Sequence, residues 1–112
     1  MAKLICIYWR DIPAQVIGRV GRKTKVKKDL APRFAKAIDR AAMRAGRGSS
    51  DAYLADWRRE AEEVSGDLEA MVNERVSAFE SEFADEFLEA VVKAGGLVAE
   101  AKKRAAEKGQ AL

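Results

Sequence analysis

The first thirty residues of the chain carry the alternation of β-strands. Residues 3–9 (KLICIYW) form an apolar run rich in β-branched and aromatic side chains, which is typical of a strand buried on both faces. Residues 14–20 and 23–28 alternate between the two faces of a strand, and turn residues separate the runs at 10–13 and 21–22. The pattern predicts a three-stranded antiparallel meander with residues 3–9 as the central strand. One face of this sheet is expected to be basic and exposed to solvent.

Helical spacing takes over after Asp29, which can cap a first helix that ends at Gly46. A second helix is expected over residues 50–63 and a third, long one over 67–94. The inward-facing positions of the three helices are Leu30, Phe34, Ile38, Ala41 and Ala45; Tyr53, Leu54, Trp57 and Ala61; and Leu68, Val72, Val76, Phe79, Phe83, Phe87, Val91 and Ala94. The last stripe runs for roughly 40 Å, so this helix either kinks or offers part of its stripe to another chain.

Together these elements predict an α+β fold. A three-stranded antiparallel meander is followed by two or three helices, of which the last is long and amphipathic. Residues 1–96 are expected to form a single domain that ends at a pair of glycines. Residues 97–112 have a helix-forming composition but few apolar side chains, which predicts a charged, mobile helical tail.

Composition excludes several classes of protein. The 112 residues, of which 48% are hydrophobic and 35% charged, have the make-up of one globular domain. The longest apolar run is far shorter than the roughly 20 residues of a membrane helix and lacks a signal-peptide pattern, so we expect a cytoplasmic protein without membrane contact. Cys6 is the single cysteine, so the chain cannot form an intramolecular disulfide. The sequence has no histidine, which excludes histidine-based metal sites and catalytic triads. We expect no catalytic, cofactor-binding or metal-binding residue, and no enzyme.

Charge divides the chain into two halves. Residues 1–59 hold 15 basic and 5 acidic side chains, net +10, whereas residues 60–112 hold 6 and 13, net −7. The halves can neutralise each other by packing together, or the basic half can bind anions or RNA without reading sequence. The candidate residues for anion binding are Arg22, Lys25, Arg33, Arg40 and Arg44. The competing interpretation is a solvated helix face and an edge strand protected by lysines.

Aromatic and charged residues cluster where the first strand ends. The candidate contacts for a protein partner are Tyr8, Trp9, Arg10, Asp11 and Trp57. Trp and Arg often anchor protein interfaces, so this corner and the uncovered part of the long helix are expected to form a contact surface. The alternative is that Arg10 pairs with Asp11 or with a helix carboxylate to fix the turn.

Four segments of the chain occur in the order of a known family. They are YWRDIPAQV at 8–16, GRKTKVK at 21–27, FAKAIDRAAMRAG at 34–46 and DAYLADWRR at 51–59. In these segments the chain resembles the small bacterial family called "virulence factor", best known from alphaproteobacteria. The resemblance covers the chain to about Gly96 and implies no catalytic residue and no cofactor. Similar proteins accompany genes of folate and corrinoid one-carbon metabolism, which implies an accessory or interaction role.

The leading prediction is therefore a non-enzymatic cytoplasmic accessory module. It binds a protein partner, or self-associates through the long helix, in one-carbon (folate or corrinoid) metabolism or in virulence. The alternative is an anion- or RNA-binding protein that uses the basic N-terminal half.

Overall fold

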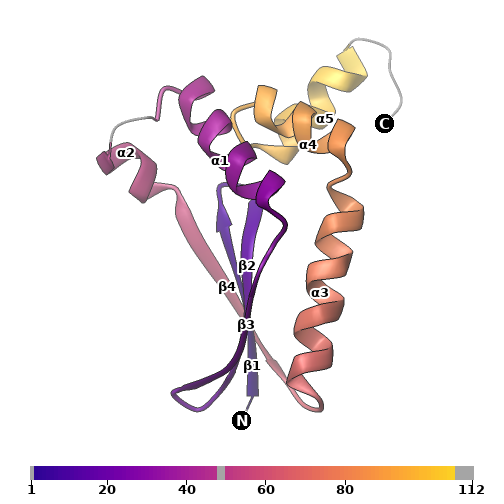
Figure 1. The fold of residues 1–112 in the computed structure, drawn as a ribbon. Coiled ribbons are helices and arrows are strands. Elements are labelled where there is room, and N and C mark those ends of the chain that lie inside the picture. Colours follow the sequence, from indigo (N-terminus) through magenta and orange to yellow (C-terminus); the bar gives the residue numbers. More distant parts are fainter. Residues whose placement is uncertain (1, 48–49, 108–112) are drawn as a thin grey trace.

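The computed structural model describes residues 2–47 and 50–107 (Figure 1). Four strands, β1 (Ala2–Trp9), β2 (Ile12–Val20), β3 (Lys23–Asp29) and β4 (Trp57–Val64), form one antiparallel sheet in the order β3-β2-β1-β4. The helices are α1 (Pro32–Arg44), α2 (Ser50–Ala55), α3 (Leu68–Glu82), α4 (Asp85–Lys93) and α5 (Val98–Glu107). The α+β class and the N-terminal meander confirm the prediction, whereas the fourth strand and two of the helices are additional.

The meander forms as the hydrophobic pattern predicts, but its first turn is shorter. Arg10 and Asp11 alone make this turn, and Arg10 adopts a left-handed conformation with φ 52°. Pro13 lies inside β2 opposite Tyr8, next to a register shift, where a missing N–H is tolerated. Gly21, at φ 61°, supplies the turn between β2 and β3, as expected.

The helix predicted over residues 50–63 is wrong beyond Ala55. Residues 57–64 instead form β4, which pairs with β1 along its whole length. Leu54 is 64% exposed and Ala61 is also exposed, so neither faces inward as predicted. The composition of this segment favours a helix. Without β4, however, the apolar β1 would be an edge strand with unpaired backbone groups, and pairing satisfies them.

The long helix predicted over 67–94 breaks after Glu82, so the kink is the correct alternative. Phe83 leaves the helical conformation (φ −99°, ψ 61°), and α4 begins two residues later. Arg33 of α1 donates to the carbonyl oxygens of Phe83 and of Glu80, the latter at 2.9 Å. It thereby satisfies carbonyl groups at the end of α3 that a continuing helix would have bonded itself.

Two further boundaries differ from the prediction. Asp29 ends β3, and the cap position of α1 is Ala31, which makes no side-chain cap bond. The tail was predicted to be helical and mobile. It is helical over Val98–Glu107, but it packs on α4, and Ala101 is only 3% exposed. Residues 108–112 of that tail lie outside the described residues. No helix within the described ranges has the length and apolarity to cross a membrane.

The core lies where the sheet meets the helices. Helix α3 covers one face of the sheet, and α1, α4 and α5 gather beyond the end that carries the β1–β2 turn (Figure 1). The largest fully buried side chains of this junction are Trp9, Ile12, Val16, Phe34, Val72, Val91 and Val92. Most of the long apolar stripe, which lies on α3 and α4, is buried here against the sheet and α1.

The opposite face of the sheet is covered only near that same end, by α1 and α2 (Figure 1). We call the remainder the open face, because no helix among the described residues lies on it. Strand alternation and the pairing register place on it the half-buried Ile7 and Ile17, with Lys3, Arg19, Lys27, Arg59 and Glu63 around them. Ile5 belongs to the same row but is only 1% exposed. This face therefore carries basic side chains together with the Glu63 carboxylate, around half-buried isoleucines.

Candidate interaction site

Trp9 belongs to the core and not to a contact surface. Its side chain has no exposed area, and its Nε1–H donates to the carbonyl oxygen of Tyr53 at 2.9 Å. The two rings stack with their centroids 6.0 Å apart. Gly96 closes over the indole so tightly that a Cβ at this position would lie 2.9 Å from Cζ3. The prediction of Trp9 as a partner contact is wrong, because α2 and the α4–α5 turn at Gly96 close over the end of β1.

Arg10 and Asp11 fasten the turn to two distant segments of the chain. Arg10 donates from Nε to Oδ2 of Asp56 at 3.2 Å and from Nη1 to the carbonyl oxygen of Gly95 at 3.0 Å. Asp11 accepts the backbone N–H of Val98 at 2.9 Å and so satisfies one orphan donor at the start of α5. Arg10 does fix the turn, but its carboxylate partner is neither Asp11 nor a helix residue as that alternative expected: Asp56 lies between α2 and β4.

Tyr8 points to the other face of the sheet, toward α3. Its ring meets Phe79 edge-on at 5.8 Å, and the Arg58 guanidinium lies 4.3 Å from its centroid. Burial raises the pKa of Tyr8 to about 12, so the phenol stays protonated over the physiological range. Phe79 and Arg58 of the chain itself therefore contact this ring, whereas the remaining aromatic candidate, Trp57, is half-buried.

Asp56 joins the turn to the segment after α1. Besides Arg10, it binds Arg47, whose Nε lies 2.8 Å from Oδ2, and its side chain is only 18% exposed. The hydrogen bond from Arg47, and after it the contacts with Arg10, hold the pKa of Asp56 below its ordinary value against the opposing effect of burial. This carboxylate is ionised in the folded protein at pH values where the unfolded chain takes up a proton.

Replacing Asp56 with asparagine is expected to cost about 1.5–3 kcal/mol of unfolding free energy at neutral pH, because two guanidinium groups lose a charged acceptor. A depressed pKa stabilises the fold above the unfolded value of about 3.9, and this contribution disappears as the pH falls through the folded value. The difference between wild type and Asp56→Asn in urea unfolding should therefore be constant above about pH 5 and shrink below it. A difference that does not change with pH would contradict this assignment.

The five candidate anion-binding residues do not form one surface. Arg33 binds the end of α3, and Arg40 makes a two-pronged pair with Glu89 at 2.8 and 2.7 Å. Arg44 lies exposed at the end of α1. Arg22 and Lys25 belong to the β2–β3 turn region at the opposite end of the sheet (Figure 1). The basic α1 thus packs against the acidic α4, as expected if the two charge halves neutralise each other.

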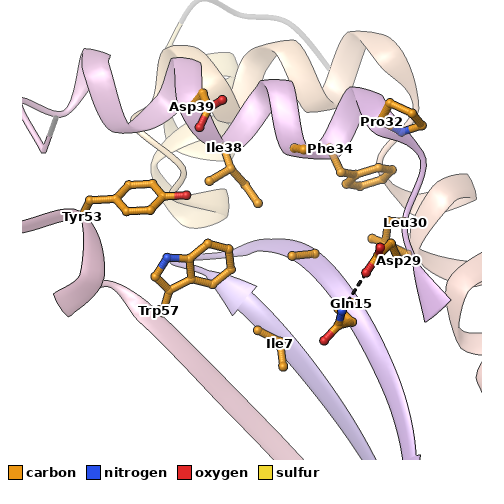
Figure 2. Close-up of a pocket in the computed structure, with 12 residues that line it drawn as sticks. Ile7, Gln15, Asp29, Leu30, Pro32, Phe34, Ile38, Asp39, Tyr53 and Trp57 are labelled. Atoms are coloured by element: carbon orange, nitrogen blue, oxygen red, sulfur yellow. Dashed lines mark hydrogen bonds between the residues drawn. The ribbon is translucent and has the colours of Figure 1, made fainter. Parts of the chain in front are cut away.

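A pocket of about 530 Å³ opens between α1 and the open face, next to α2 (Figure 2). One end is aromatic, where Tyr53 of α2 and Trp57 of β4 meet edge to face with centroids 5.8 Å apart, and both are half-buried. At the other end Gln15 donates to Asp29 at 2.6 Å. The apolar walls comprise Ile7, Ala14, Leu30, Phe34, Ala35 and Ile38. We call this site the aromatic pocket.

The charged groups that line the aromatic pocket are both acidic. Asp29 lies at its polar end and Asp39 of α1 above the aromatic end (Figure 2). Burial, and after it the Asp39 carboxylate, raises the pKa of Tyr53 above its ordinary value. The sequence singled out Trp57 but assigned Tyr53 to a helical core stripe, and it gave no sign of Asp29 and Asp39 as a pair. Their convergence depends on α1 crossing above the sheet.

Cys6 and the acidic residues form no further reactive centre in the described part of the chain. Burial raises the pKa of the Cys6 thiol, and Arg75 opposes this from 3.4 Å without reversing it. No three His, Cys, Asp or Glu side chains of residues 2–47 and 50–107 converge as metal ligands would.

The chain was compared with protein families, curated proteins and solved structures. A protein-family model described as "Virulence factor" matches residues 7–92, a span from β1 to α4 that includes the whole lining of the aromatic pocket. No curated protein and no solved structure matches the chain.

Proposed function

Because the chain belongs to the virulence factor family, whose model spans residues 7–92, we propose that it is a non-enzymatic interaction module that docks a protein partner at the aromatic pocket. The family description states a biological context and no chemistry, whereas the geometry of the pocket supports docking. One observation carries it: the half-buried pair Tyr53 and Trp57 stands at the mouth of an apolar pocket that continues onto the open face.

The size and composition of the pocket suit recognition better than catalysis. Its volume falls within the range of about 300–1,000 Å³ that binding pockets in proteins occupy. Half-buried aromatic side chains are the residues that most often anchor protein interfaces. The lining holds no histidine, cysteine or lysine, and its polar groups are an amide, a phenol, an indole and two carboxylates. This set can orient and bind a group but offers no paired nucleophile and base.

The open face extends the proposed contact beyond the pocket. Ile7 and Gln15 line the pocket and also belong to the rows of side chains that continue down this face. A partner anchored in the pocket can therefore continue along the half-buried Ile7 and Ile17, which charged side chains border. An accessory role in one-carbon (folate or corrinoid) metabolism or in virulence, in the cytoplasm, is the setting we propose from the family resemblance.

Replacing Trp57 with alanine is expected to reduce capture of the partner by about tenfold or more, since truncation of an anchoring aromatic residue costs about 2 kcal/mol or more. The tagged protein is used to capture partners from native lysate with and without nuclease, and each captured protein is quantified by mass spectrometry. The control is Leu97→Ala, which truncates an exposed apolar side chain outside the pocket.

Two results would argue against docking at the pocket. In the first, the Trp57→Ala protein, still folded by circular dichroism, captures the same proteins as wild type in the same amounts. In the second, nuclease removes everything that the wild-type protein captures, which would favour the anion- or RNA-binding alternative.

A further inference from the structure

We infer that the aromatic pocket receives a cationic side chain, arginine or lysine, of the docked protein. This inference rests on the proposed function and specifies the chemistry of the anchor. It starts from the charges around the pocket: the two ionisable carboxylates of the lining, Asp29 and Asp39, are accompanied by no basic residue of the lining.

This acidity is local, because it lies within the basic half of the chain. Of the five acidic residues among residues 1–59, Asp11 and Asp56 are already paired with arginines of the same chain. Asp29 accepts from the neutral amide of Gln15, which leaves its charge uncompensated. Asp39 makes no ion pair within the described ranges, since the nearby arginines of α1, such as Arg40, turn toward α4.

A long cationic side chain matches each part of the pocket. Its methylene groups can lie against the apolar wall formed by Phe34 and Ile38 while its charged end reaches a carboxylate. The faces of Trp57 and Tyr53 attract a cation through their ring quadrupoles. Both carboxylates would repel an anionic group. A neutral apolar side chain would displace water from the Asp29 carboxylate without offering it a hydrogen-bond donor or a positive charge in return.

A protein side chain fits better than a free small amine because of the surroundings of the pocket. The pocket is open toward the sheet face, so the backbone that carries the cationic side chain can continue along Ile7 and Gln15. The basic residues of that face, among them Lys27 and Arg59, are complementary to acidic residues elsewhere in the partner. A partner with a basic anchor beside acidic side chains would therefore use both regions.

The test is a titration that compares two probes of the same shape. Nα-acetyl-arginine amide carries the guanidinium, and Nα-acetyl-citrulline amide replaces it with a neutral urea group. Binding is followed by the NMR resonances of the backbone amides and of the Trp57 indole N–H at low salt. Arginine amide should shift the resonances of the pocket with a Kd of millimolar order, and citrulline amide should bind about threefold to tenfold more weakly.

Asp39→Asn should weaken arginine binding by about threefold to tenfold, with little change in citrulline binding. Asp51→Asn is the matched control, because it removes the same charge from α2 outside the pocket lining and should leave both affinities unchanged. Added salt should weaken the binding of arginine selectively.

The inference is overturned if citrulline amide binds as tightly as arginine amide, or if Asp39→Asn binds arginine as wild type does. Failure of the inference is distinguishable from failure of the proposed function. Capture of a partner that depends on Trp57, together with equal binding of the two probes, would leave docking at the pocket intact and remove only the cationic anchor.

Discussion

Trp9→Ala is expected to lower the free energy of unfolding by about 3–5 kcal/mol, because truncation of a fully buried tryptophan loses its apolar burial and leaves a cavity. The side chain has no exposed area and packs on Tyr53, whose carbonyl oxygen accepts its indole N–H. This loss is a large share of the free energy of unfolding of a typical domain, which is about 5–15 kcal/mol. Urea unfolding followed by circular dichroism measures it.

Trp9→Phe provides the gentler variant, since it keeps most of the ring volume and should cost about 1–3 kcal/mol. Leu97→Ala is the control, because this side chain is 40% exposed and its truncation should change stability by less than about 1 kcal/mol. If Trp9→Ala were as stable as wild type, the indole would have to be at the surface, and the original prediction of Trp9 as a partner contact would return.

Gly96→Ala is expected to destabilise the protein by about 2–4 kcal/mol for two separate reasons. Gly96 has φ 92°, a conformation in which an alanine is strained. The new methyl group would also lie 2.9 Å from Cζ3 of Trp9, so the packed turn must move to admit it. Thermal and urea unfolding of the two proteins measure the difference.

Gly21→Ala separates these two causes. Gly21 also has a positive φ, 61°, but no atom lies within 4 Å of a Cβ at this position, so its substitution carries the backbone strain alone, about 1 kcal/mol. The larger loss for Gly96→Ala should diminish in a Trp9→Phe background, in which the smaller ring leaves room. Equal losses for the two glycines would show that Trp9 does not press on the α4–α5 turn.

The elements with strong local signals were predictable from the sequence. The apolar run of β1, the alternation of β2 and β3, and the stripe of Phe34 and Ile38 in α1 each specify one periodicity. β4 gave the opposite signal, because its arginine, glutamate and alanine residues favour a helix and its Trp57 and Ala61 happen to be four residues apart. Only the unpaired edge of β1, a tertiary requirement, makes it a strand.

The site was predictable in part. Trp57 was a predicted contact and lines the pocket, whereas Trp9 was chosen for the same reason and is buried. A residue type alone cannot distinguish the two, because the difference depends on what covers each ring. A kink in the long helix was one of the two expected alternatives, but its position after Glu82 was not predictable, since the end of α3 is bound by Arg33, which lies 50 residues from Phe83 along the chain.

The bond between Asp11 and the start of α5 sets a limit on when the protein can complete its fold. It joins residues 87 positions apart, so the turn cannot gain its partner until Val98 has been added to the chain. At about 5–20 residues per second, a ribosome needs about 4–17 s to add the intervening chain. During those seconds the meander can already form, but Trp9 still lacks Gly96 above it. Until residues 96–98 have been added, the nascent chain therefore carries an indole that Tyr53 can already contact but that Gly96 does not yet cover.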